Sequence, residues 1–224
     1  MMRNAIIALI LTAGALGTTT PSPAQSPETT LARASKAYTA IRSVRASFTQ
    51  TITNPLTGSS ASSAGEVVQR PPRRISVTFT RPAGDRIVAD GKTLWIYLPS
   101  TNPGQVIRMS AGEGAAGAFD MIAELVRHPK DRYTLTSAGT ADVEGHATHA
   151  VRLTPRQTGG SIAGATVWVD DDDALARQFE TTDANGVTRH ILITRLATNV
   201  AVPRDAFRFT PPPGVRVVEP GTTP

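Results

Sequence analysis

Histidine and aspartate are the residue types in this chain best suited to acid–base chemistry or metal binding. His146 and His149 lie three residues apart, and Asp170–Asp173 is an unbroken acidic run. Residues three apart in a strand point to opposite faces, so the two histidines make a poor metal pair. The acidic run lacks the glycine and glutamate of a calcium-binding loop, which favours a solvated hairpin turn. Neither group predicts a metal site.

A glycine-rich segment, Gly112–Gly117, formally matches the dinucleotide-binding pattern G-x-G-x-x-G. It lies between a predicted strand and a predicted helix, but no βαβ repeat follows it, so we interpret it as a flexible hinge. The sequence shows no nucleophile elbow, Walker loop or paired carboxylates. These patterns favour a binding protein that is not an enzyme and that uses no cofactor.

The composition limits the remaining classes. The chain has 224 residues, of which 40% are hydrophobic and 5% aromatic, and it contains no cysteine. This apolar fraction is enough for a core, and the length fits one domain or at most two small ones. Without cysteine there can be no disulfide, thiolate metal site or lipidated cysteine. The net charge of +5 comes from scattered basic residues, so we expect no nucleic-acid partner.

The N-terminus has the pattern of an export signal. A short basic leader containing Arg3 precedes the uncharged apolar run Ala5–Leu16, which is too short to span a bilayer comfortably. Small residues around Pro23-Ala24 offer a cleavage site. We therefore expect a signal peptide at 1–24, a single domain at 25–218 and a disordered tail at 219–224.

Hydrophobic periodicity predicts a chain that consists mainly of strands. A helix is expected from Ser26 to about Arg42, and a second where Phe119, Met121, Ile122 and Leu125 recur at helical spacing. Residues 54–63 are expected to form a flexible turn or loop. Alternation predicts strands at 44–52, 65–70, 75–80, 86–89, 93–97, 105–109, 133–136, 149–153, 166–169, 177–181 and 187–196, and an edge strand at 215–218.

This order of elements predicts an α+β, mainly β fold built on a large, curved antiparallel sheet. Two helices are too few to fill the concave side of a sheet of about ten or eleven strands. The inner face would then be partly hollow and lined by apolar side chains, which is where a ligand could bind.

Four short segments follow one another in order along the chain. They are Phe48-Thr49-Gln50, Gly65–Pro71, Ile87–Tyr97 with D-G-K-x-L-W-x-Y, and Asp205–Val215 with F-x-F followed by P-P-x-G-V. Together they resemble the bacterial outer-membrane lipoprotein carrier family (LolA), which has an early F-x-Q strand, a G-x-(V/L)-(W/V)-x-R-P segment, a D-G-K-x-L-W-x-Y segment and a closing F-x-F motif.

The resemblance implies an incomplete, half-open β-barrel covered by an N-terminal helix and a helical lid, with lipoprotein acyl chains in the hollow. In the family, the arginine of the R-P pair, here Arg70, is tied to holding the lid closed. We expect the hollow and the lid to be lined by Phe48, Val68, Val77, Phe79, Leu94, Trp95, Ile96, Tyr97, Phe119, Met121, Ile122 and Leu125.

The resemblance also implies partners. Family members take lipoproteins from an inner-membrane ABC-type lipoprotein-releasing complex and pass them to an outer-membrane receptor. This predicts a periplasmic chaperone for lipoproteins that acts as a monomer. The family usually has an aromatic residue shortly after the R-P pair, whereas this chain has Pro72-Arg73-Arg74-Ile75.

Three alternatives stay open at the level of sequence. One is a periplasmic carrier of another amphiphile, such as a glycolipid or a fatty acid, on the same fold. Another is an exported hydrolase that uses His146, His149 and the Asp170–Asp173 run. The last is an envelope sensor that shares the fold.

Overall fold

The computed structural model of the chain describes residues 25–111, 129–157, 159–160 and 162–220. The predicted signal peptide and the predicted lid helix with Phe119, Met121, Ile122 and Leu125 lie outside these residues. The elements, in chain order, are α1 (Pro27–Thr39), β1 (Val44–Asn54), β2 (Ser59–Arg70), β3 (Arg74–Arg81), β4 (Ala83–Asp90), β5 (Thr93–Tyr97), β6 (Gln105–Ser110), α3 (Pro129–Arg132), β7 (Tyr133–Val143), β8 (His146–Pro155), β9 (Ile162–Asp170), β10 (Ala176–Asp183), β11 (Thr188–Thr198) and β12 (Arg216–Val218).

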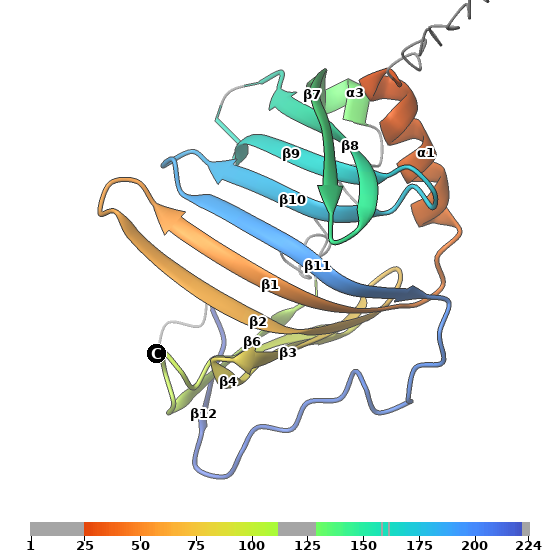
Figure 1. Cartoon of the computed structure of the whole chain (residues 1–224). Helices are drawn as coiled ribbons and strands as arrows, with labels where there is room; N and C mark the ends of the chain where they lie inside the picture. Colours follow the sequence, from red (N-terminus) through yellow and green to blue (C-terminus); the bar gives the residue numbers. More distant parts are fainter. Residues whose placement is uncertain (1–24, 112–128, 158, 161, 221–224) are drawn as a thin grey trace, which may run out of the picture.

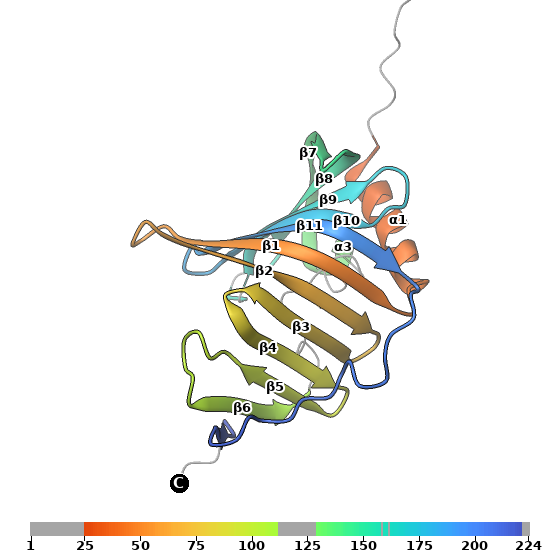
Figure 2. The same cartoon turned by 60° about the horizontal axis from the view of Figure 1, so that its bottom comes forward.

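The strands form one sheet in the order β12-β6-β5-β4-β3-β2-β1-β11-β10-β9-β8-β7. The sheet curves without closing, so β12 and β7 lie at its two ends (Figures 1 and 2). The mainly β, half-open architecture is therefore confirmed, with 12 strands instead of ten or eleven. One pairing differs from the antiparallel prediction, because β12 runs parallel to β6.

The turn or loop predicted at residues 54–63 is confirmed as a turn at 55–58 but is wrong for residues 59–63, which form the first part of β2. They pair with β1 from Ser59 opposite Asn54 onwards. Hydroxyl groups meet across the two strands, with Thr53 Oγ1 3.3 Å from Ser60 Oγ and Thr51 Oγ1 3.4 Å from Ser62 Oγ. Serine-rich composition indicates a loop in isolation, but pairing with a threonine-rich neighbour satisfies the same groups in a ladder.

Helix α1 begins and ends close to its predicted limits. The Ser26 side chain accepts a hydrogen bond from the Thr29 N–H at 3.2 Å, and Pro27 occupies the first turn, where its missing N–H costs nothing. The helix packs against β7, β8 and β9 through its buried Leu31 and Ala34. It therefore covers the inner face at one end of the sheet.

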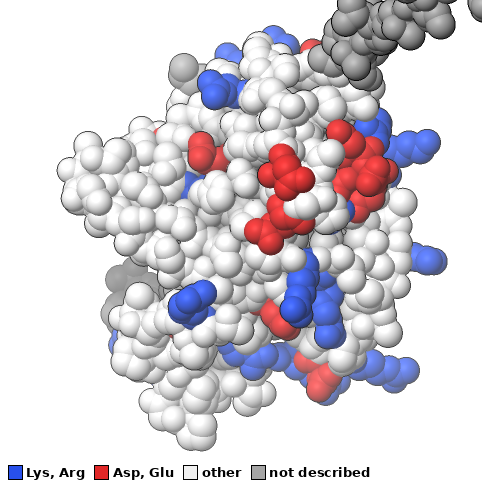
Figure 3. Space-filling model, viewed as in Figure 1, with Lys and Arg blue, Asp and Glu red and all other residues white. Residues whose placement is uncertain are grey.

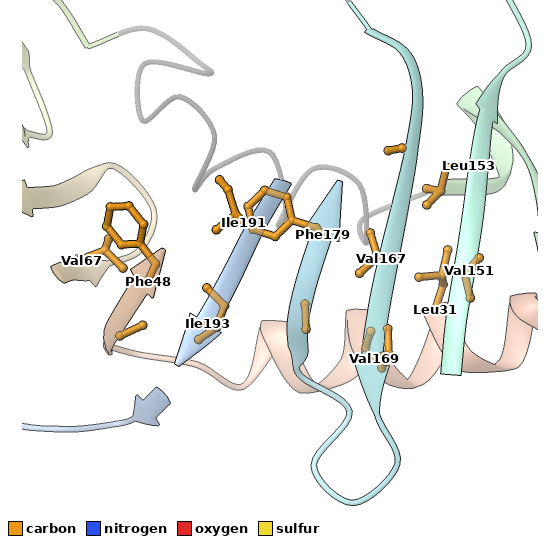
Figure 4. Packing of buried hydrophobic residues seen from close by; sticks show 14 of the residues in the cluster. Leu31, Phe48, Val67, Val151, Leu153, Val167, Val169, Phe179, Ile191 and Ile193 are labelled. Carbon is orange, nitrogen blue, oxygen red and sulfur yellow. The ribbon is translucent and has the colours of Figure 1, made fainter. Parts of the chain in front are cut away.

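The strand register defines which residues share that inner face. Phe48 on β1 is opposite Ile193 on β11, Phe179 on β10 is opposite Val167 on β9, and Val151 on β8 is also opposite Val167. Figure 4 shows these side chains directed to the same side of the sheet as Leu31 of α1. The main core is thus a single apolar layer on the inner face.

Gly65 on β2 allows two aromatic rings of the inner face to meet. Phe48 and Phe79 lie on the strands to either side of Gly65, and their rings pack edge to face with centroids 5.8 Å apart. A Cβ at Gly65 would lie 2.5 Å from the Thr78 carbonyl oxygen and 3.1 Å from Cζ of Phe48. Only glycine fits this approach, and the β2–β3 register shifts beside it, where the sheet bends.

We expect Gly65→Ala to destabilise the protein by ~2–3 kcal/mol, because the new methyl group clashes with backbone that cannot rotate away. Urea unfolding followed by circular dichroism measures this change. Gly104→Ala is the matched control, since its added Cβ would meet nothing within 4 Å. Equal stability of the two variants would contradict this account of the bend.

Candidate functional site

The inner face of β3–β6 carries a row of apolar side chains that are only partly buried. Phe79, Ile87, Ile96, Ile107 and Met109 share this face by register, and each keeps part of its surface exposed. We refer to these five residues as the half-buried patch. Helix α1 packs at the other end of the sheet, against β7, β8 and β9. The patch is therefore apolar surface that a ligand with a hydrocarbon chain could cover.

Five predicted lining residues lie on the inner face. Phe48, Val77 and Leu94 are 2%, 1% and 3% exposed and belong to the core, so they pack beside the patch on the same face and stabilise it. Phe79 and Ile96 belong to the patch itself. The structure thus separates residues that build the inner face from residues that are still accessible on it.

Val68, Trp95 and Tyr97, which were also predicted to line the hollow, lie on the outer face. Trp95 pairs with Val88, and Tyr97 pairs with Arg86. These pairs alternate with the inner-face pair of Ile96 and Ile87, so their side chains point to the other side of the sheet. Successive residues of a strand alternate between faces, so Leu94, Trp95, Ile96 and Tyr97 cannot all line one side. Val68 pairs with Ser76 on the same outer face.

The outer face of β4–β6 has its own apolar packing. The Phe209 ring lies 5.7 Å from that of Trp95 and 5.9 Å from that of Tyr97, measured between centroids. Beneath this aromatic group, Val88 and Val106 are fully buried. The C-terminal segment, which ends in β12, therefore holds β4–β6 from outside (Figure 2).

Arg108 and Glu219 extend this outer contact. The Arg108 guanidinium lies over the Trp95 ring, 5.6 Å from its centroid, and Nη1 of Arg108 lies 2.9 Å from Glu219 Oε1. Glu219 was expected to lie in a disordered tail, but the structure places it in this ion pair. Residues 221–224 of that predicted tail lie outside the described residues.

Sequence reasoning missed Ile87, Ile107 and Met109. The signal that could have found them is cross-strand pairing from a known inner residue. Ile96 is opposite both Ile87 and Ile107, and Leu94 is opposite Met109. The hairpin at Asp90-Gly91-Lys92 was predicted, and its tight turn fixes the first of these pairings.

Arg70 ends β2 opposite Arg74 of β3 and is exposed. It lies at the β2–β3 turn, at the rim of the sheet. Its predicted role as a latch depends on a lid helix that lies outside the described residues, so this role stays a prediction.

A second cluster of charges connects α1 to the turn between β9 and β10. Asp170 is 2% exposed, and its Oδ2 lies 2.7 Å from both Arg177 Nε and His146 Nδ1. The neighbouring Asp171 Oδ1 lies 2.5 Å from His149 Nδ1. The solvated turn predicted for Asp170–Asp173 is therefore wrong for Asp170, which is buried and ion-paired.

The same turn forms hydrogen bonds with side chains of α1. Arg33 Nη2 donates to the Asp171 carbonyl oxygen at 2.6 Å, and the Ala176 N–H donates to the Tyr38 hydroxyl at 3.4 Å. Burial raises the pKa of Tyr38 to about 12, so its phenol stays protonated. Backbone groups of the β9–β10 turn thus hold the helix that covers one end of the inner face.

His146 and His149 lie on opposite faces of β8. Among the described residues, no group of three or more His, Cys, Asp or Glu side chains is placed to hold a metal ion. Within the same residues, no helix is both long and apolar enough to cross a membrane.

Comparisons with known proteins agree on one family. Residues 39–210 match the family described as "Outer membrane lipoprotein carrier protein LolA". The outer-membrane lipoprotein carrier protein of Chromobacterium violaceum is 28% identical and covers 93% of this chain and 96% of its own. That of Serratia proteamaculans is 26% identical over 96% and 97% of the two chains.

One solved structure supports the fold. An uncharacterized conserved protein from Thermus thermophilus superposes with a TM-score of 0.55 at 16% identity, covering 85% of this chain and 96% of its own. At this identity the likeness concerns the arrangement of the strands.

We expect Asp170→Asn to make the free energy of unfolding depend less on pH under acidic conditions. Burial by itself raises the pKa of Asp170, but hydrogen bonds from the Asp172 N–H and from Arg177 outweigh it and hold the pKa below its usual value. As the pH falls, the folded protein therefore takes up this proton at a lower pH than the unfolded chain does. The resulting stability is present above about pH 4 and is lost as the pH falls through the folded pKa.

In Asp170→Asn this contribution is absent, so stability near neutral pH should fall by ~2–3 kcal/mol and should depend less on pH in acid. Urea unfolding at several pH values measures both effects. Asp172→Asn, at an exposed position of the same turn, should change stability by less than ~0.5 kcal/mol. An unchanged pH dependence under acidic conditions in Asp170→Asn would refute the assignment.

Proposed function

The chain belongs to the LolA family of outer membrane lipoprotein carrier proteins, and we propose that it binds the acyl chains of lipoproteins on the inner face of its sheet. The observation that carries this proposal is the half-buried patch of β3–β6. Its five side chains are contiguous across four strands and are not fully buried. Binding hydrocarbon there would bury both the patch and the ligand.

The free energy of transferring an acyl chain into water explains why such a carrier is needed and why its affinity for cargo should be modest. Burying an acyl chain is worth ~0.8 kcal/mol per methylene, so an unassisted chain would not leave a membrane for water at a useful rate. A carrier must offset most of this cost and still release its cargo. A shallow surface of branched and flexible side chains, including Met109, offers area without the rigid complementarity of a tight pocket.

The cellular route is part of the same proposal. A signal peptide at 1–24 would deliver the mature protein to the periplasm, where it would receive lipoproteins from an ABC-type complex of the inner membrane. It would then pass them, as a monomer, to a receptor at the outer membrane. The curated relatives named as outer-membrane lipoprotein carrier proteins, which match most of the chain, support this role.

Arg70 and the 119–125 segment would control access. By alternation Arg70 shares the outer face with Val68, so as a latch its long side chain would have to reach around the rim. A guanidinium offers five donors and can bond several carbonyl oxygens of a helical lid at once. Entry of cargo would displace the lid, and Gly112–Gly117 would act as its hinge.

Adjacent positions on β5 provide a direct test of which face binds. A photo-reactive benzoylphenylalanine in place of Ile96 should crosslink to lipoprotein acyl chains, because that position faces inward. The same group in place of Tyr97 should not, because it faces Phe209. Mass spectrometry of the crosslinked peptides measures the difference, and equal yields at both positions would exclude binding on the inner face.

Release from spheroplasts tests the function itself. Purified mature protein added to spheroplasts should bring lipoproteins into the soluble fraction as complexes. Phe79→Ala should reduce their amount about tenfold, because it removes the aromatic member of the patch. Thr78→Ala changes the neighbouring, outward-facing residue and should leave release unchanged, with circular dichroism confirming that both variants are folded. Absence of soluble lipoprotein with the unaltered protein would overturn the proposal.

A further inference from the structure

The turn of the β1–β2 hairpin carries the most exposed large apolar side chain among the described residues. Leu56 is 82% exposed, and only Val217, at 43%, joins it in this class within the same part of the chain. The hairpin projects from the sheet (Figures 1 and 2). A single exposed leucine is ordinary on a protein surface, so the inference depends on what surrounds Leu56 in the hairpin.

The outer part of this hairpin is uncharged. No Asp, Glu, Lys or Arg occurs between Arg45 and Glu66, and nine of these 20 residues are threonine or serine. Thr57 Oγ1 lies 2.7 Å from Ser59 Oγ, which continues the ladder of paired hydroxyls toward the tip. Figure 3 shows the projecting end as a white area without Lys, Arg, Asp or Glu.

Local hydrogen bonds hold the tip in shape. The Asn54 side-chain oxygen accepts from the Leu56 N–H at 2.9 Å, and Gly58 adopts a φ of 66° that closes the turn. The outer part of β2 extends beyond β3, whose pairing with β2 begins at Ala64 opposite Arg81. On its other side β1 stays paired with β11 as far as Thr53 opposite Thr188. The tip is therefore a defined turn that is free of β3, so ordering it at a surface costs little entropy.

We propose that the β1–β2 tip inserts Leu56 into the interfacial layer of a phospholipid bilayer, which rests on the proposed function because it would place the carrier at the membrane that receives its cargo. A bilayer interface accepts leucine together with hydroxyl-bearing residues that hydrogen-bond to headgroups, and the hydrocarbon below it penalises charge. The uncharged hairpin has this composition over its whole projecting length.

The charges beside the hairpin fit the same orientation. Arg81 is exposed at the end of β3, next to the base of the projecting part, where its guanidinium could contact lipid phosphate. The adjacent β10–β11 turn contains Asp183, whose Oδ1 accepts from the Asn185 and Val187 N–H groups at 2.8 and 3.0 Å. These hydrogen bonds hold the Asp183 carboxylate within its own turn.

Leu56→Cys gives a direct test, since the chain has no other cysteine and a fluorescent label attaches at one site. An environment-sensitive label at this position should shift to shorter wavelength with vesicles of phosphatidylethanolamine and phosphatidylglycerol. The same label at Thr136→Cys, on the exposed edge strand β7, should not shift. A label at Leu56→Cys that stays in water with these vesicles, or that responds only to an outer-membrane receptor protein, would overturn the proposal.

A second variant separates this inference from the proposed function. Leu56→Ser should still take lipoprotein from spheroplasts, because the tip lies outside the half-buried patch. Transfer of that lipoprotein to the same vesicles should fall about tenfold, as expected for removing one leucine from the interface. Unchanged transfer, or an equal loss of uptake and transfer, would refute bilayer insertion. If instead the proposed function is wrong, the unaltered protein will take up no lipoprotein, while the fluorescence shift of the label with vesicles will still occur.

Discussion

Packing of the C-terminal segment against the outer face of β4–β6 is the interaction on which the rest of this structure depends. Most of the buried apolar side chains lie on the inner face, where α1 covers the β7–β9 end. At β4–β6 the strands are also buried from outside, by Phe209 on Trp95 and Tyr97 over the fully buried Val88 and Val106. Because this half of the sheet is stabilised from outside, its inner residues do not have to be buried fully for the fold to be stable.

The two halves of the sheet are then joined at β2, where the β2–β3 register shifts beside Gly65. Gly65 lets Phe48 of the core meet Phe79 of the patch, so the curved sheet passes from a well-packed half to a half-buried one without a break. At the far end, the buried Asp170 and its partners hold the β9–β10 turn on which α1 rests. Aromatic packing at one end and ion pairs at the other thus fix the shape of the surface between them.

This division of labour accounts for the chemistry of a carrier. A hydrocarbon ligand needs apolar area, and its release requires that the protein remain folded when the ligand has left. A half-buried patch supported by buried Val77 and Leu94 meets both requirements, because the residues that stabilise the fold differ from those that would contact cargo. The charged groups at the α1 end, by contrast, contribute to structure, although their residue types had first suggested catalysis.

The sequence by itself determined the class of fold, the family and most strands, because period-two alternation and turn residues such as Asp90-Gly91-Lys92 act over a few neighbours. It also assigned Phe79 and Ile96 to the inner face, where the strand register places them. It misplaced Trp95 and Tyr97 because hydrophobicity shows that a residue is buried, but not on which face. It took residues 59–63 for a loop and Asp170 for a solvated acid for a related reason. Only the tertiary structure supplied the strand pairing that makes serine a ladder residue, the position of Arg177 that lets a carboxylate be buried, and the C-terminal segment that turns the outer face of β4–β6 into a second core. Each of these depends on which groups the fold brings into contact, and the type of a residue does not show this.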